Sequence, residues 1–137
     1  MPCIQVTTNV PLGAKPALAA ALTALFSTAL KAAPGHVHVA IIDGAFISLA
    51  GDADSAAALV SVKAADGSIT ADARKAITAG IGAALTQHVS PSLQAGRSYI
   101  TFEDLPVQNV AVGGSIMTFS TMHTARSVDV PIDDIAP

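Results

Sequence analysis

The sequence predicts one α/β domain: two strand–helix–strand units that share a four-stranded sheet, with both helices on one face. Three observations predict this fold class. The chain has 137 residues, which suits a single domain. Of these, 51% are hydrophobic and 12% are charged, so the chain can bury a sizeable core. Predicted strands and helices alternate, and the unit recurs after roughly sixty residues.

The first unit begins with a strand over residues 3–10 (CIQVTTNV), where β-branched side chains alternate. Pro16 suits the first position of a helix, which we expect over residues 16–30. Its apolar face recurs at helical spacing in Leu18, Leu22, Leu25, Phe26 and Ala29. Residues 36–43 (HVHVAIID) predict a strand buried on both faces. The loop that follows contains a short extended piece at 46–49.

The second unit repeats this order. A strand is expected over residues 55–64 (SAAALVSVKA), a helix over 71–89 with Thr70 as its N-cap, and a strand over 97–104 (RSYITFED). The apolar face of the helix contains Ile77, Ile81, Ala84, Leu85 and His88. Two residues of low helix propensity indicate that neighbours pack closely against this helix: Gly80 and Gly82.

The predicted layering leaves one face of the sheet without helices. Each strand–helix–strand unit favours parallel pairing of its strands through a right-handed crossover. Both helices then cover one face, and we expect the other face to be bare and apolar. A small domain with so little charge is expected to cover that face in an oligomer.

Charge and composition exclude several classes of partner. The formal net charge is −3, and of seven basic residues only Arg74 and Lys75 are adjacent, so no nucleic-acid partner is expected. The longest apolar run, residues 37–42, is too short to span a bilayer, and we expect no membrane partner. The start lacks the pattern of a secretory signal, which favours a cytoplasmic protein or one secreted without a signal peptide.

Cysteine and histidine content argues against disulfide and metal chemistry. Cys3 is the one cysteine, so no intrachain disulfide can form, and we expect it to be a small core residue. His36 and His38 alternate on one predicted strand and share a face, but no further ligands lie nearby in the sequence. We therefore expect no metal site.

Pro2, at the mouth of the first strand, has two open interpretations. A proline can begin a strand because no ladder N–H is needed there. Alternatively, removal of Met1 would leave an N-terminal proline whose nitrogen is a secondary amine that can take up a proton. Residues at the strand start cannot decide between these interpretations.

Four segments carry a resemblance to a known family. They are the opening MPCIQVTTNVP, the central LAGDADSAAALVSV, SPSLQAGRSYITFED, and VGGSIMTF near the end. Together they resemble the tautomerase superfamily, in the branch of macrophage migration inhibitory factor and D-dopachrome tautomerase. The resemblance implies a tautomerase-like domain over residues 1–119, followed by a C-terminal extension over 120–137.

This resemblance implies a fold and an activity. Members have the double strand–helix–strand fold, assemble as trimers, and form active sites between subunits. Pro2 would be the general base of a cofactor-independent keto–enol tautomerase acting on small carboxylates such as phenylpyruvate. An ordinary α-amine has a pKa near 8, and an apolar pocket lowers it towards neutral pH, where a base works best.

The resemblance also implies substrate-binding residues at one end of the sheet. Lys31 lies about one position from the family's basic residue, and it either reaches the pocket or solvates the helix end, where a cation is favourable. Lys63 is a second candidate cation for a substrate carboxylate, or a solvated lysine at a strand end. Ala64 would line the pocket beside it.

Other positions match or depart from the family pattern. Tyr99 matches the pocket tyrosine, and Thr101 replaces an asparagine with a shorter donor. Gly114 stands where an aromatic side chain often closes the pocket, so the site would be wider and wetter. We expect Arg97 to be structural.

Three functions follow from these residues. The leading hypothesis is the tautomerase. The alternative is a cytokine-like trimeric binding or signalling protein with weak or no tautomerase activity, which the departures favour. Dehalogenation or decarboxylation ranks last, because those relatives use additional arginines near the proline, and this chain has three arginines in total. The extension over 120–137 is either disordered or adds a strand to a neighbouring subunit.

Overall fold

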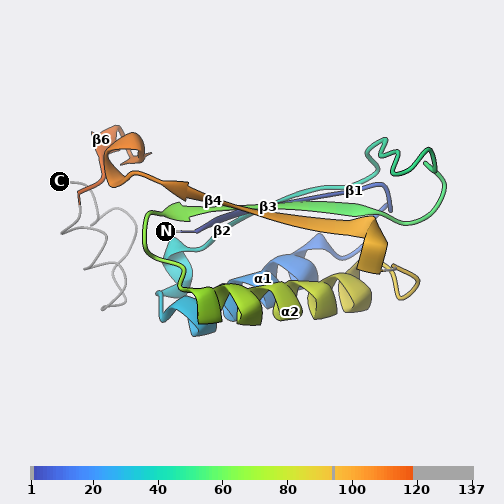
Figure 1. The fold of residues 1–137 in the computed structure, drawn as a ribbon, viewed down its shortest axis with the longest axis horizontal. Helices are drawn as coiled ribbons and strands as arrows, with labels where there is room; N and C mark the ends of the chain where they lie inside the picture. The colour runs from blue at the N-terminus through green and yellow to red at the C-terminus, as the bar shows by residue number, and fades with distance from the viewer. Residues whose placement is uncertain (1, 94, 119–137) are drawn as a thin grey trace.

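The computed structural model describes residues 2–93 and 95–118. In Figure 1 the strands form one layer and two helices form a second layer against it. The helices and strands are β1 (Cys3–Thr8), α1 (Lys15–Leu30), β2 (His38–Ile42), β3 (Ala58–Ala65), α2 (Ala71–His88), β4 (Ser98–Leu105), β5 (Ala111–Val112) and β6 (Ser115–Ile116). Three single-turn helices connect them: η1 (Pro34–His36), η2 (Ala95–Arg97) and η3 (Val107–Asn109).

The four long strands form one sheet in the order β2-β1-β3-β4. Pairing is parallel between β1 and β2 and between β3 and β4, as expected within a strand–helix–strand unit. β1 and β3 pair antiparallel and so join the two units. Both helices lie on one face of this sheet (Figure 1). The predicted fold class is confirmed.

α1 forms because its apolar residues recur on one side, and Pro16 stands in its first turn, where a missing N–H costs nothing. The buried side chains of this helix are Leu18, Leu22, Phe26 and Leu30. The helix ends at Lys31, which adopts a left-handed conformation with φ 52°. The Ala32 N–H then donates to the Ser27 carbonyl at 3.1 Å and turns the chain back towards the sheet.

α2 begins at its predicted cap. The Thr70 hydroxyl accepts a hydrogen bond from the Ala73 N–H at 3.1 Å, and Asp72 stands in the first turn, where a negative charge is favourable. The buried side chains are Ile77, Ile81, Ala84 and Leu85. His88, the last residue of the helix, is half-buried at the end of this face, and Val89 enters the core beyond it.

The two glycines of α2 differ in their surroundings. A Cβ atom at Gly80 would collide with the Leu25 side chain of α1, so the helices approach closely there. A Cβ at Gly82 would meet nothing within 4 Å. The prediction of close packing is confirmed at Gly80 and wrong at Gly82.

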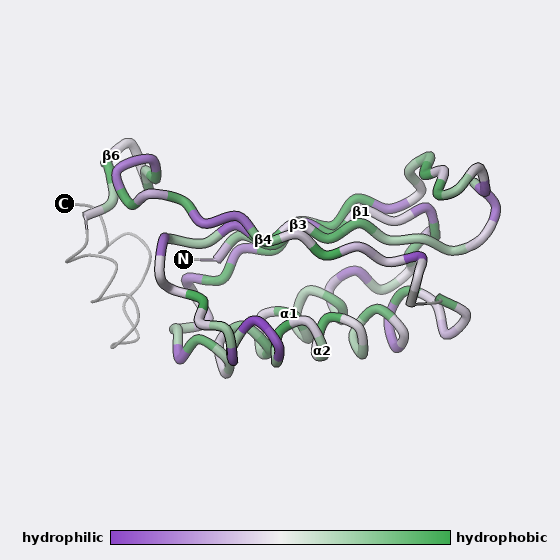
Figure 2. The backbone as a smooth tube through the Cα atoms, in the orientation of Figure 1, coloured by the Kyte–Doolittle hydropathy of each residue, from purple (hydrophilic) through white to green (hydrophobic). Residues whose placement is uncertain are grey.

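The core fills the space between the sheet and the two helices. Alternate residues of the central strands point into it: Ile4 and Val6 from β1, and Val60 and Val62 from β3. They pack against the apolar sides of α1 and α2. Figure 2 shows hydrophobic residues recurring along the strands and along both helices, which is the pattern of a two-layer domain.

β2 differs from its prediction. It lies at an edge of the sheet, and every residue in it is at least partly exposed, with Ile42 at 47%. The expectation of burial on both faces is wrong because the helices cover one face alone. β1 also ends at Thr8, earlier than predicted, and the extended piece at 46–49 contains no strand, although Leu49 forms an isolated bridge to Asp52.

A small second core lies beyond β4, at the β5–β6 hairpin. Ala65, Val110 and Met117 are buried together there, and the Met117 N–H donates to the Val110 carbonyl at 2.6 Å. The hairpin thereby packs against the end of β3. The predictions for residues 120–137 lie outside the described residues.

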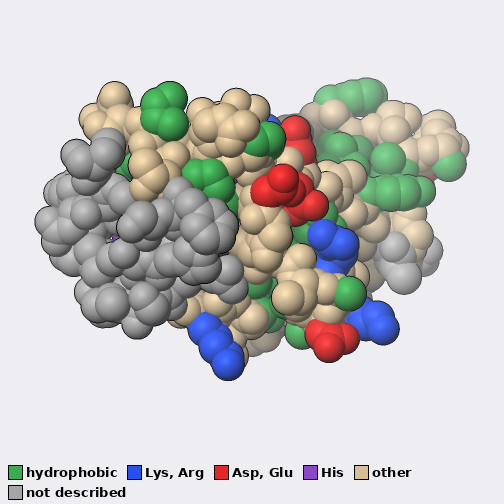
Figure 3. Space-filling model, turned by 60° about the vertical axis from the view of Figure 1, so that its left-hand side comes forward, with side chains coloured by type: hydrophobic (Ala, Val, Ile, Leu, Met, Phe, Trp, Pro, Cys, Tyr) green, Lys and Arg blue, Asp and Glu red, His purple; other side chains and the backbone are tan. Residues whose placement is uncertain are grey.

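The surface of the described chain is sparsely charged. Figure 3 shows few acidic or basic side chains among large apolar and uncharged areas on the face in view. Within residues 2–93 and 95–118, neither helix has the length and hydrophobicity that crossing a membrane requires.

Candidate functional site

The helix-free face of the sheet carries three rows of side chains, because residues paired across strands point to the same side. The row nearest the N-terminus contains His38, Cys3, Lys63 and Glu103. The middle row contains Ala40, Gln5, Ser61 and Thr101. The far row contains Ile42, Thr7, Leu59 and Tyr99. This face therefore changes from charged to apolar along the strands, whereas the sequence predicted an apolar face throughout.

Pro2 stands immediately before β1 and is fully buried. Its carbonyl accepts a hydrogen bond from the His38 N–H at 3.0 Å, so the backbone at the start of β1 is fixed by the start of β2. This bond involves the Pro2 carbonyl. The Pro2 nitrogen is part of the amide bond to Met1, and removal of Met1 would convert it into an amine. The chemistry of the site depends on that conversion, because an amide nitrogen cannot act as a base.

A hollow of about 400 Å³ on the helix-free face is lined by Cys3, Gln5, His38, Ser61 and Lys63 among others. Cys3 directly follows Pro2, but Pro2 is not itself a lining residue. Cys3 is half-buried here, so the prediction of a core residue is wrong; it belongs to the strand positions that face away from the helices. Burial raises the pKa of the Cys3 thiol, and burial lowers the pKa of His38. Both side chains are therefore uncharged near neutral pH.

Lys63 supplies the charge of this hollow. Its ammonium nitrogen lies 3.9 Å from a carboxylate oxygen of Glu103, the residue opposite it on β4. Both side chains are exposed, Lys63 at 52% and Glu103 at 60%. Ala64 follows Lys63 and is buried on the opposite side of the strand, facing the helices.

In Figure 1, α1 ends at the side of the molecule where β1 and β2 begin, and Lys31 directly follows its last residue. From Lys31 the chain runs to β2, whose first residue, His38, donates its backbone N–H to the Pro2 carbonyl. Lys31 itself is exposed, and it does not line the hollow beside Pro2. Both interpretations of this lysine remain predictions.

Tyr99 and Thr101 line a second hollow, of about 340 Å³, together with Gln5, Leu59 and Ser61. Glu103 lies opposite Lys63, and Tyr99 precedes Glu103 by four residues in β4, which is roughly 13 Å at the rise of a strand. Tyr99 is 59% exposed. One chain thus brings Pro2, Lys63 and Ala64 to one end of the sheet and keeps Tyr99 away from them.

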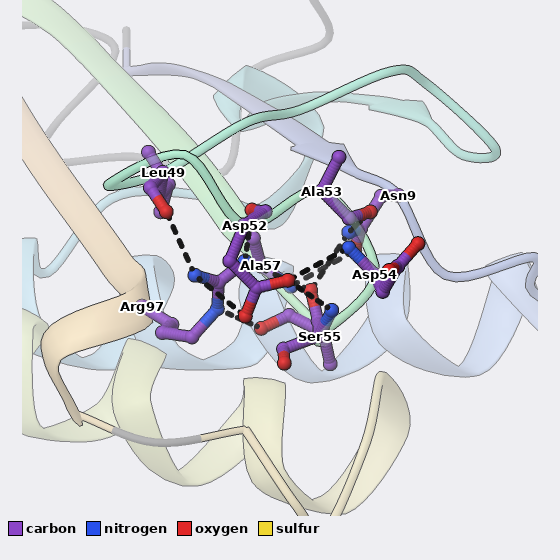
Figure 4. A network of polar contacts seen from close by, with 9 residues as sticks. Asn9, Leu49, Asp52, Ala53, Asp54, Ser55, Ala57 and Arg97 are labelled. Carbon is purple, nitrogen blue, oxygen red and sulfur yellow. Dashed lines mark hydrogen bonds and ion pairs between the residues drawn. The ribbon is translucent and has the colours of Figure 1, made fainter.

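Arg97 anchors the long loop between β2 and β3 to the start of β4 (Figure 4). Its guanidinium donates to four backbone carbonyls at 3.0–3.2 Å, those of Leu49, Asp52, Ser55 and Ala56. One of its nitrogens also lies 3.6 Å from the Asp52 carboxylate. These contacts agree with the structural role predicted for this arginine.

The same loop is fixed from β1 and from within. The Asn9 side chain accepts from the Ala57 N–H at 2.8 Å and donates to the Ser55 carbonyl at 2.9 Å (Figure 4). Hydrogen bonds from Ser55 and then from the Asp54 N–H lower the pKa of Asp52 to about 2. Sequence reasoning missed Asp52 and Asn9, although Asp and Asn are the side chains that favour such turns.

Sequence reasoning also missed Glu103 and the position of His38 in the hollow. The available signal was the strand alternation, which puts Glu103, Thr101 and Tyr99 on one face of β4. Placing Glu103 opposite Lys63 required the register between β3 and β4. Within residues 2–93 and 95–118, no group of three or more His, Cys, Asp or Glu residues could hold a metal ion.

Comparisons with known proteins identify the family. The family model for macrophage migration inhibitory factor (MIF) matches residues 1–118. No curated protein matches the chain.

Among solved structures, a MIF homologue from Prochlorococcus marinus is 21% identical with a TM-score of 0.74, and the match covers 82% of this chain and 96% of that one. MIF from Oncomelania hupensis is 22% identical with a TM-score of 0.74, covering 88% and 85%. Leishmania major MIF2 is 27% identical with a TM-score of 0.70, covering 83% and 95%. The chain therefore belongs to the macrophage migration inhibitory factor family, within the tautomerase superfamily.

Proposed function

We propose that this protein is a cofactor-independent keto–enol tautomerase whose general base is the amine of Pro2 after removal of Met1. The observation that carries the proposal is the position of Pro2 in a matched MIF-family chain. It stands at the mouth of β1, its carbonyl accepts a hydrogen bond from the His38 N–H, and the residue after it, Cys3, lines the hollow that contains Lys63.

The chemistry needs one proton acceptor and one stabilised oxygen. The free amine takes the proton from the carbon α to a carbonyl, and the electron pair of the C–H bond moves into the enolate. The ammonium then returns the proton to oxygen or to carbon, so no oxidant or cofactor is consumed. Burial lowers the pKa of such an amine below its ordinary value near 8, which keeps it unprotonated near neutral pH.

The substrate class follows from size and charge. A hollow of about 400 Å³ suits a small molecule. Lys63 offers a cation for a carboxylate or a developing enolate oxygen, and Lys31 is the second candidate. The side chain of Ala64 faces the helices, so it would not form part of the wall. Small keto–enol carboxylates resembling phenylpyruvate fit this description.

The proposed active form is a homotrimer with sites between subunits. Tyr99 and Thr101 line a neighbouring hollow of the same chain, which shares Gln5 and Ser61 with the hollow that contains Lys63. In the proposed trimer they would reach the Pro2 site of another copy. Large apolar side chains remain exposed at the far end of the helix-free face and in the adjoining loop: Ile42, Phe46, Leu59 and Tyr99. Burying them against a second copy is favourable.

A trimeric binding protein with weak or no catalysis is the second candidate. The burial of Pro2 favours it, because a base must reach its substrate. Gly114 also favours it, because the aromatic side chain that closes the pocket in the family is absent at this position. Gly114 has φ +87°, a backbone conformation that residues with a side chain rarely adopt.

The test is phenylpyruvate ketonisation and enolisation by the purified protein, with intact mass confirming loss of Met1. Pro2→Ala retains an amine but loses the ring that orients it, so we expect at least a tenfold loss of kcat/KM. A trimmed trimer with no activity would favour the binding protein.

A further inference from the structure

We propose that Glu103 sets the charge preference of the candidate site: by pairing with Lys63, it weakens the attraction of the site for substrate carboxylates. This inference rests on the proposed function and deepens it, because it concerns which carbonyl substrates the site prefers. It assigns a specificity role to a residue outside the hollow beside Pro2.

The geometry of the pair carries the proposal. Lys63 and Glu103 are directly opposite in the parallel β3–β4 ladder, so their side chains leave the same face. The ammonium nitrogen and the carboxylate oxygen lie 3.9 Å apart. Lys63 lines the hollow, and Glu103 stands beside it on the edge strand.

The hollow offers no other positive charge among its described lining residues. Cys3 and His38 are uncharged near neutral pH for the reasons given above, and the remaining residues are amides, hydroxyls or alkyl groups. A ligand carboxylate that binds here must therefore share Lys63 with Glu103 or displace it. An uncharged ester of the same shape does neither.

The expected effect is modest because both members of the pair are exposed to water. Exposed ion pairs contribute at most about a factor of five in an equilibrium constant. Removing the Glu103 charge should therefore raise the preference for a carboxylate over its ester by about threefold to fivefold. The effect should decrease as salt is added, because salt screens exposed charges.

Asp104 provides a matched control. It is the next residue of β4, it is also exposed, and its loss changes the net charge equally. It lies opposite Ala64, so its side chain leaves the other face of the sheet. A general effect of net charge would appear in Asp104→Asn, whereas an effect of the pair would not.

The experiment compares phenylpyruvate with its methyl ester, using full-length, Met1-free protein. The wild type, Glu103→Gln, Asp104→Asn, Lys63→Gln and the Lys63→Gln/Glu103→Gln double variant are measured. We expect the kcat/KM ratio of acid to ester to rise about threefold to fivefold in Glu103→Gln alone. The rise should disappear when Lys63 is also replaced. Equal ratios in Glu103→Gln and the wild type, or an equal rise in Asp104→Asn, would overturn the proposal.

A binding measurement separates this proposal from the proposed function. Cinnamate and methyl cinnamate cannot tautomerise, so their dissociation constants report charge preference without catalysis. If the wild type turns over neither substrate but Glu103→Gln binds cinnamate about threefold to fivefold more tightly with ester binding unchanged, the tautomerase fails and the role of Glu103 stands. If cinnamate binding is unchanged or undetectable in both proteins, the role of Glu103 is refuted.

Discussion

Replacing Arg97 with alanine should release the loop between β2 and β3 from the start of β4. The Arg97 side chain is 14% exposed, and its guanidinium donates four hydrogen bonds to backbone carbonyls of this loop. The loop has little regular structure of its own, so its path depends on these bonds, on those of Asn9 and on those that the Asp52 carboxylate accepts. Tyr99 follows Arg97 by two residues, so the variant also perturbs the hollow that Tyr99 lines.

The expected loss of stability in Arg97→Ala depends on what the four freed carbonyls can bind instead. Hydrogen bonds from a charged donor contribute about 1.5–3 kcal/mol each when buried. Ser55 is exposed, and freed carbonyls near the surface recover water, so we assign about 1 kcal/mol to each bond. The sum, reduced for relaxation of the loop, is about 3 kcal/mol. Such a loss is large for a domain whose total stability is about 5–15 kcal/mol.

Equilibrium urea unfolding, followed by circular dichroism, measures this loss. Arg97→Lys is the control, because it retains the charge near Asp52 but cannot reach four carbonyls; we expect it to lose about 2 kcal/mol. Stability of Arg97→Ala within about 0.5 kcal/mol of the wild type would refute the reasoning, since that is the range of ordinary surface substitutions. Wild-type stability in Arg97→Lys would show that charge alone holds the loop.

Three further predictions concern stability. Gly82→Ala should stabilise the protein by up to about 1 kcal/mol, because alanine has the higher helix propensity. Gly80→Ala should stabilise it less or destabilise it, because the added methyl group would collide with α1. The midpoints of urea unfolding compare the two variants. Thr70→Ala should cost about 1 kcal/mol in the same assay through loss of the α2 cap. Hydrogen bonds from Ser55 lower the pKa of Asp52 to about 2. The stabilisation of the folded state by the Asp52 carboxylate is therefore present above the unfolded-state pKa near 3.9 and is lost as pH falls towards 2. Asp52→Asn should flatten the pH dependence of unfolding between about pH 4 and 2, and an unchanged slope would contradict this assignment.

Periodicity predicted the fold because each element of this chain is locally consistent. The apolar residues of α1 and α2 recur at helical spacing, and Thr70 caps α2 as predicted. Errors arose where burial depends on partners distant in sequence. β2 is as apolar as a central strand, but its place at the edge follows from the pairing of β1 with β3, which composition does not reveal.

The site was partly predictable for the same reason. The resemblance pointed to Pro2 and Lys63, and the structure brings their strand ends together through the Cys3–Lys63 pairing. The Lys63–Glu103 pair depends on the register of two strands separated by a helix, so the sequence could not indicate it. Cys3 was assigned to the core because cysteine is often buried, but strand alternation puts it on the helix-free face.

The most direct test of the central claim compares two forms of the same chain that differ in Met1 alone. Phenylpyruvate tautomerisation is measured on Met1-free protein and on protein that retains Met1, with intact mass and trimer content checked for both. If the Pro2 amine is the base, retention of Met1 converts it to an amide, and kcat/KM should decrease by at least about a hundredfold. Equal rates for the two forms would show that another group removes the proton and would contradict the account.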